Sequence, residues 1–166
     1  MAQTLEYTVG DYVVYPAHGV GRITSIEMHA LGEQQVELYA INFEKERMTL
    51  KVPVLKAKRS GLRKLSSRDR IKAAMDTLRG PSRIRRTMWS RRAQEYEAKI
   101  NSGDPVSIAE VVRDLHRGSD QPEQSYSERQ IYQAALERLS RELAAVESID
   151  ERRAAERVEQ VLCRAA

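Results

Sequence analysis

The chain has 166 residues, of which 41% are hydrophobic and 31% charged, and its formal net charge at pH 7 is +4. This composition is typical of a folded protein and excludes a disordered chain, while the length suits one medium domain or two small ones. The single cysteine, Cys163, excludes an internal disulfide, and no apolar run reaches the length needed to cross a bilayer.

The first third of the chain has the pattern of a small β domain. Runs of β-branched and aromatic residues alternate with turn signals, so strands are expected at residues 9–15, 20–26, 36–41 and 48–52. A hairpin turn is expected at residues 31–34. Four or five short strands within about 55 residues indicate a small closed barrel, to which we assign residues 1–62. Such barrels usually act as binding modules.

From residue 65 onward the hydrophobic spacing becomes helical. About five helices are expected, and their starts are marked by Ser66 or Ser67, by a position near Trp89, by Asp104 with Pro105, by Ser125 with Glu128, and by Ser148 with Glu151. Residues 63–166 are therefore predicted to form an all-α domain. The expected fold class is α+β in two modules, a β-barrel followed by helices.

The positive charge is confined to the middle of the chain. Residues 56–92 contain fourteen Lys or Arg and two Asp or Glu, a net charge of +12, whereas residues 1–55 and 93–166 carry net charges of −3 and −5. Such a block indicates either a polyanionic partner or a solvated basic face. The predominance of arginine, whose planar guanidinium matches phosphate, favours a nucleic acid.

Trp89, the single tryptophan, lies inside this block and allows two interpretations. Arginine pairs at residues 85–86 and 91–92 flank it; guanidinium groups bind phosphate, and an aromatic ring can stack on bases or wedge between them. Trp89 also shares helical spacing with Tyr96, as the first core residue of a helix would. The residues alone slightly favour the core interpretation and leave both open.

Signatures of catalysis are nearly absent. The three histidines, His18, His29 and His116, are scattered without the spacing of metal ligands. Cys163 follows an apolar helical stripe, which indicates packing rather than a nucleophile. We therefore expect no enzyme activity, no metal and no cofactor.

Four segments occur in a recognisable order along the chain. They are VGDYVVYPAHG at residues 9–19, KVP at 51–53, WSRR at 89–92, and SGD at 102–104 followed by AEVVRDL at 109–115. Together they resemble the CarD/CdnL family of bacterial transcription regulators over nearly the whole chain. The first segment is also similar to the RNA-polymerase-interacting domain of the transcription-repair coupling factor.

The resemblance implies a Tudor-like or SH3-like barrel that binds the β subunit of RNA polymerase, and a helical domain that faces promoter DNA at the upstream edge of the transcription bubble. It implies that Trp89 wedges into the minor groove and helps to keep the open complex from reclosing. The adjacent basic pair, Arg91 and Arg92, would contact the DNA backbone. The residues expected to contact DNA are Trp89, Arg91, Arg92, Arg86, Arg85 and Met88.

The barrel positions depart from the family pattern. Positions that contact polymerase in the family are often arginine, and the matching positions here are His29 and Lys51, with Leu31 nearby. Lysine keeps the charge without the planar fork, and histidine is mostly neutral at pH 7. Where some family members have a lysine after the arginine pair, this chain has Gln94. We expect the polymerase-binding site at Lys51, His29 and Leu31.

Three classes of function remain open. The leading one is a non-catalytic regulator that binds polymerase and stabilises open promoters. The second is a stand-alone, nonspecific architectural DNA-binding protein, and the third is a translation or elongation factor with a KOW-like barrel. Because the first residues have no signal-peptide pattern and the chain has a single cysteine, we expect a cytoplasmic protein. The leading function adds the expectation of nucleoid association. We also expect a monomer and no membrane partner.

Overall fold

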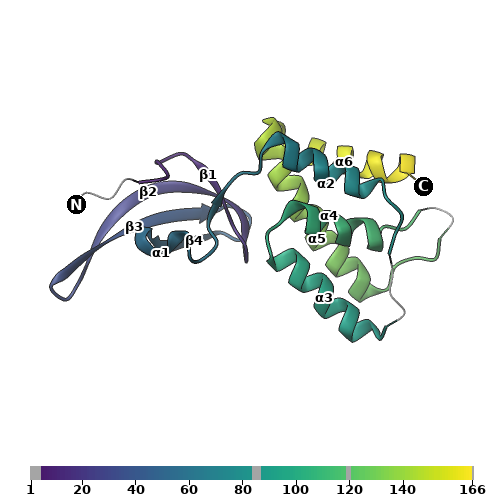
Figure 1. Cartoon of the computed structure of the whole chain (residues 1–166), viewed down its shortest axis with the longest axis horizontal. Coiled ribbons are helices and arrows are strands. Elements are labelled where there is room, and N and C mark those ends of the chain that lie inside the picture. Colours follow the sequence, from purple (N-terminus) through teal and green to yellow (C-terminus); the bar gives the residue numbers. More distant parts are fainter. Residues whose placement is uncertain (1–4, 84–86, 119–120, 166) are drawn as a thin grey trace. The chain divides into compact units, whose positions relative to one another are not determined.

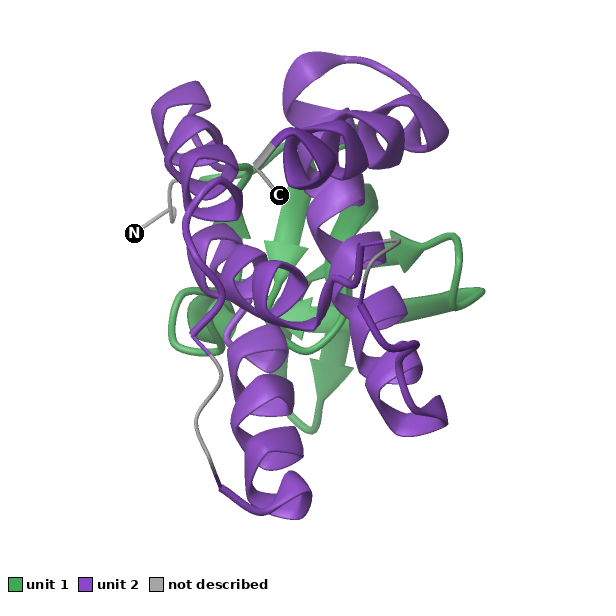
Figure 2. Ribbon diagram, turned by 90° about the vertical axis from the view of Figure 1, so that its right-hand side faces the viewer, with its two compact units in different colours: residues 1–65 green, residues 66–166 purple. Residues whose placement is uncertain are grey.

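The computed structural model describes residues 5–83, 87–118 and 121–165. The chain forms two compact units, residues 1–65 and residues 66–166, shown in two colours in Figure 2. The first unit consists of strands and one short helix, and the second consists of helices (Figure 1). The predicted α+β fold in two modules, with the β module first, is confirmed.

The β unit is one antiparallel sheet. Its elements are β1 Tyr12–Tyr15, β2 Gly19–Leu31, β3 Gln34–Phe43, β4 Met48–Pro53, α1 Val54–Ala57 and β5 Arg63–Lys64. The strands pair in the order β4-β3-β2-β1-β5, and the register of β2 against β3 shifts at a bulge between Ile23 and Ser25. The core of the unit is formed by Tyr7, Val13, Ile23, Tyr39, Ile41, Phe43, Val52, Ala57 and Leu62.

The structure explains why two positions in the β unit are glycine. Gly32 has a φ of +64° in the two-residue turn between β2 and β3, a backbone conformation that residues with a side chain rarely adopt. Gly21 lies against the core, where an added Cβ would stand 2.6 Å from the Cγ2 of Ile41 and 2.7 Å from a ring carbon of Phe43. The sheet can therefore close over its core only with a glycine at position 21.

The strands differ in length from the sequence prediction. The predicted strand at residues 20–26 is part of β2, which continues for 13 residues to Leu31. Beyond Ile26 both faces of β2 are half-buried or exposed, so the hydrophobic alternation that reveals a strand is lost there. The prediction also missed α1 and β5, whose four and two residues are too short to produce a periodic signal.

The second unit contains the five expected helices. They are α2 Arg68–Leu78, α3 Trp89–Asn101, α4 Pro105–Leu115, α5 Tyr126–Glu147 and α6 Glu151–Ala165. The side chains of Ser67, Asp104 and Ser125 accept hydrogen bonds from backbone N–H groups three residues on, as N-caps do. In the described part of the chain no helix combines the length and the apolar character that a membrane span requires.

The predicted capping box of the last helix is wrong. Ser148 is the C-cap of α5 and has left-handed backbone angles, with φ +55°, whereas an N-cap needs an extended conformation. Asp150 caps α6 instead, because its carboxylate accepts the N–H of Arg153 at 2.7 Å. Ser and Asp are comparable caps, so spacing alone could not distinguish them.

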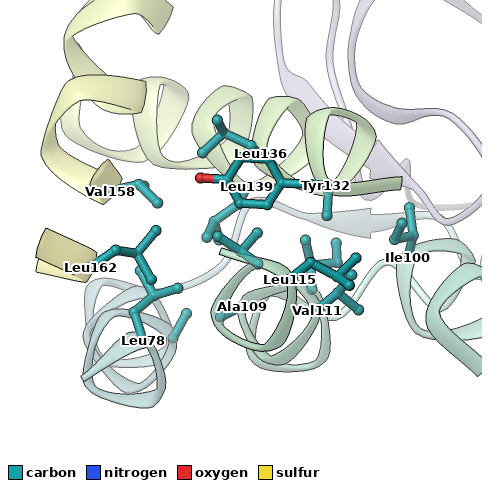
Figure 3. Close-up of a cluster of buried hydrophobic side chains, with 14 of the residues drawn as sticks. Leu78, Ile100, Ala109, Val111, Leu115, Tyr132, Leu136, Leu139, Val158 and Leu162 are labelled. Carbon is teal, nitrogen blue, oxygen red and sulfur yellow. The ribbon is translucent and has the colours of Figure 1, made fainter. Parts of the chain in front are cut away.

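The helical core gathers around α4. Figure 3 shows side chains of α2, α4, α5 and α6 meeting in one apolar cluster, to which α3 contributes Ile100. Val111, Val112 and Leu115 of α4 are completely buried. Two carboxylates are also buried, Asp114 and Glu142, and the latter accepts the backbone N–H of Ser66 at 2.9 Å. A buried charge needs such partners, because desolvation is costly.

Candidate nucleic-acid interface

Trp89 is the first residue of α3, and no side chain among the described residues caps this end of the helix. The N-cap position is Met88, which makes no side-chain hydrogen bond to the helix, and the first turn contains no acidic residue. The N–H of Arg91 donates to the carbonyl of Met88 at 3.1 Å. The N–H groups of Trp89 and Ser90 have no partner in the described part of the chain. These two N–H groups and the positive end of the helix dipole would favour an anion here. The first turn also contains Arg91 and Arg92, which add formal positive charge.

The indole of Trp89 is half-buried. It packs against the edge of the helical core without belonging to its buried centre. Its neighbour Met88 is 77% exposed, and Ser90 and Arg91 are exposed as well. Trp89 thus has a packed side and an accessible side, so the position suits both a packing role and contact with a ligand.

Arg92 lies between two aromatic rings. Its guanidinium carbon is 5.4 Å from the ring centroid of Trp89 and 5.7 Å from that of Tyr96, and its Nη2 donates to the hydroxyl of Tyr96 at 3.3 Å. The two rings are 6.3 Å apart and tilted by 51°. Unlike Arg91, Arg92 is half-buried. The adjacent arginines therefore have different surroundings, which the sequence did not indicate.

Asp114 holds the segment that leads from α2 toward α3. Its carboxylate accepts the backbone N–H of Arg83 at 3.0 Å and the Nε of Arg113 at 2.9 Å, and its backbone carbonyl accepts the hydroxyl of Ser82 at 3.4 Å. The side chain of Asp114 is only 4% exposed. Sequence reasoning missed this role, although a lone carboxylate in the apolar stripe of α4 was a signal for it.

The structure brings together four of the six residues expected to contact DNA. Met88, Trp89, Arg91 and Arg92 lie at the start of α3. The other two, Arg85 and Arg86, lie outside the described residues. The described part of the candidate interface is therefore the start of α3.

The basic block is divided between the two units. Residues 56–65 belong to the β unit and residues 66–92 to the helical unit. Some of its arginines are also paired, since Arg70 bonds to Asp104 at 2.6 Å and Arg79 to Asp76 at 2.5 Å. The basic residues are contiguous in sequence, but this does not mean that they form one basic surface.

The residues expected to bind polymerase share one face of the sheet. Residues two apart on a strand point to the same side, so Glu27, His29 and Leu31 of β2 lie together, and the register across β3 places Lys51 of β4 on that side as well. The carboxylate of Glu27 is 3.1 Å from the Nζ of Lys51 and 3.2 Å from the Nε2 of His29. These hydrogen bonds, chiefly that from Lys51, hold the pKa of Glu27 below its usual value. Leu31 is 67% exposed.

The histidines are not assembled into a catalytic or metal site. Each has its own contact: His18 with Glu46, His29 with Glu27 and His116 with Tyr132. Within the described ranges, no group of three or more His, Cys, Asp or Glu side chains is placed to hold a metal ion.

The buried position of His116 predicts a pH-dependent stability of the helical unit. Burial lowers the pKa of this histidine from 6.5, and the nearby Arg117 acts in the same direction against Glu159. The unfolded chain therefore takes up the proton at a higher pH than the folded one, so stability is fully present above pH 6.5 and falls as the pH drops through the folded pKa. We expect the free energy of unfolding, measured in urea, to decrease across this window. His116→Gln should remove this part of the pH dependence, and an unchanged profile would contradict the assignment.

Comparison with known proteins covers both units. The CarD C-terminal domain family matches residues 73–159, and the CarD-like/TRCF RID domain family matches residues 7–66. A Bacillus subtilis (strain 168) protein named "Putative transcription factor YdeB" is 31% identical over 146 residues, which are 88% of this chain and 95% of that protein. Together with the fold, these matches define a transcription factor built of two modules. The chain belongs to the CarD family.

Proposed function

We propose that the protein binds the β subunit of RNA polymerase through its β unit and stabilises the open promoter complex through its helical unit. The helical unit would contact DNA at the upstream edge of the bubble, without reading its sequence. The observation that carries this proposal is the half-buried Trp89 at the uncapped start of α3, beside the exposed Met88 and Arg91. On this proposal the protein is a cytoplasmic, nucleoid-associated monomer that needs neither cofactor nor catalytic group.

A wedge at Trp89 has a plausible energetic basis. Inserting a ring beside an unstacked base step costs on the order of a few kcal/mol, which is lower where the duplex is already open. Phosphate contacts by Arg91 and by the N–H groups of α3 supply attraction that does not depend on sequence. If the site binds open DNA better than closed duplex, the population shifts toward the open complex. Binding to polymerase would raise the local concentration of this weak DNA site.

The sheet face with Lys51 is the proposed polymerase contact. Glu27 lies between Lys51 and His29, and the exposed Leu31 extends the face with an apolar side chain. Charged groups around an exposed apolar residue resemble the rim and centre of a transient protein interface. The match of residues 7–66 to the RID domain supports polymerase binding by this unit.

Reversing the charge at position 51 tests the polymerase contact. Lys51→Glu places a second carboxylate next to Glu27 and is expected to weaken recovery of polymerase by roughly tenfold or more, in line with about 1.4 kcal/mol per factor of ten. Affinity capture of purified polymerase by the full chain provides the measurement. The matched control exchanges the two charges, Glu27→Lys with Lys51→Glu, which restores an ion pair with the lysine displaced. Full recovery in the exchange variant would mean that only local charge balance matters.

Lys51→Glu also distinguishes a polymerase-dependent regulator from a stand-alone DNA-binding protein. All described DNA-site residues lie in the helical unit, which favours a protein able to bind DNA alone as the alternative. A polymerase-dependent regulator should lose its effect on open-complex lifetime in Lys51→Glu while its affinity for free DNA stays unchanged. An undiminished effect on the open complex would favour the stand-alone DNA-binding protein.

A further inference from the structure

We infer that Arg92 is a positioning residue that fixes the indole of Trp89, while the phosphate contact of the arginine pair belongs to Arg91. The DNA part of this inference rests on the proposed function. Its structural part, the clamp on the indole, stands independently. Two neighbouring arginines thus have separate tasks.

The spacing of the three residues places them on one stripe of α3. Arg92 is three residues after Trp89, and Tyr96 is four residues after Arg92, the intervals at which helical side chains meet. The guanidinium carbon lies 5.4 Å and 5.7 Å from the two ring centroids, within the range of cation–π attraction. Trp89 is thus linked through Arg92 to a tyrosine that is only 6% exposed and belongs to the helical core.

Two of the three guanidinium nitrogens of Arg92 are either hydrogen-bonded or buried. Its Nη2 donates to the Tyr96 hydroxyl at 3.3 Å, and its Nε is buried without a hydrogen-bond partner among the described residues. A side-on bidentate grip on phosphate uses Nε together with one Nη. Arg92 would therefore have to leave both rings to bind DNA in that way. Arg91 is exposed, so it can bind phosphate without leaving such contacts.

Fixing the indole matters for a wedge. A ring that changes rotamers in the free protein must be immobilised on insertion, and that loss of freedom weakens binding. A guanidinium packed against the indole and bonded to a buried tyrosine restricts it in advance.

The test compares Arg91→Ala with Arg92→Ala in the full chain. Each variant loses one positive charge from the same turn. Because Trp89 is the only tryptophan, its fluorescence reports on this site alone. In the free protein, Arg92→Ala should raise acrylamide quenching and lower the anisotropy of Trp89, while Arg91→Ala should leave both unchanged.

Salt dependence supplies the second measurement, on DNA that contains a preformed bubble. Arg91→Ala should reduce the slope of log affinity against log salt by about one, as loss of a phosphate contact does. Arg92→Ala should weaken binding by about 2- to 10-fold and keep the slope, because the loss is one of preorganisation. Tyr96→Phe keeps both rings and removes the hydroxyl, so its quenching should fall between wild type and Arg92→Ala.

The inference is overturned if Arg92→Ala leaves quenching unchanged and reduces the salt slope by about one, as a phosphate contact would. If that variant fails to fold, Arg92→Lys takes its place, since lysine keeps the charge without the planar group, and unchanged quenching there has the same meaning. If no variant, nor the wild type, binds the bubble DNA, the proposed function fails. The fluorescence contrast between the two positions still decides whether the clamp exists.

Discussion

Replacing Trp89 with alanine is expected to shorten the lifetime of open promoter complexes by about ten- to a hundredfold while binding to polymerase is retained. The range follows from the cost of unstacking a base step, a few kcal/mol, at about 1.4 kcal/mol per factor of ten. Polymerase binding should persist because the proposed contact lies on β2 and β4 of the other unit. The measurement is the decay of preformed open complexes after a competitor removes free polymerase.

The half-buried position of Trp89 makes a control necessary. Since the indole packs against the helical core, its removal should also lower the stability of that unit, by about 1–2 kcal/mol for a side chain that is only partly buried. Trp89→Leu keeps apolar contact with the core but has no flat ring to insert. If the wedge is correct, the leucine variant is nearly as stable as wild type and has the short lifetime of the alanine variant. A long lifetime in a folded leucine variant would show that Trp89 is a packing residue.

Local signals made most helix starts predictable. Asp104 followed by Pro105 combines a side-chain acceptor with a residue that needs no N–H donor, and α4 begins there. Ser125 likewise caps α5. The failure at Ser148 has the same origin, because a cap was inferred there from residue type and spacing alone, and Asp150 caps α6 instead. Ser148 instead ends α5 with left-handed backbone angles, which residue type and spacing did not reveal.

The sequence suggested which residues to group as a candidate site, but not the different surroundings of its two arginines. The sequence identified Trp89 and its arginines through their chemistry, and the interval to Tyr96 was visible as well. What a sequence lacks is the direction of each side chain. Arg91 and Arg92 are adjacent on a helix, so their side chains differ by about 100° in direction, and one projects into solvent while the other packs on rings.

The end of strand β2 could not be predicted from the hydrophobic pattern either. Its last residues are half-buried or exposed, so no alternation marked them, yet they contain His29 and Leu31 of the proposed polymerase face. The antiparallel register with β3 extends to Leu31, opposite Gln34. Backbone pairing therefore builds a surface whose side chains leave little trace in the hydrophobic pattern. Functional surfaces on exposed hairpins are for this reason harder to predict than cores.

Removing the carboxylate of Asp114 is expected to have the largest effect on stability. Asp114→Ala leaves the mostly buried guanidinium of Arg113 without its partner and frees the N–H of Arg83. Breaking a buried pair from one side costs about 3 kcal/mol or more. Asp114→Asn should cost less, because its amide oxygen can still accept from Arg83. Urea unfolding followed by helix circular dichroism measures both variants.

A surface pair on α2 provides the matched control. Asp76 contacts Arg79 at 2.5 Å, but both side chains are more than half exposed, so Asp76→Asn should change stability by about 0.5 kcal/mol or less. Asp114 should also affect the DNA site, because it fixes residues 82–83, at the described end of the segment that runs toward Trp89. Under conditions where Asp114→Asn is fully folded, we expect weaker DNA binding with no change in polymerase recovery. If the folded variant binds DNA as wild type does, α3 alone orients Trp89, and the buried carboxylate serves only the stability of the helical unit.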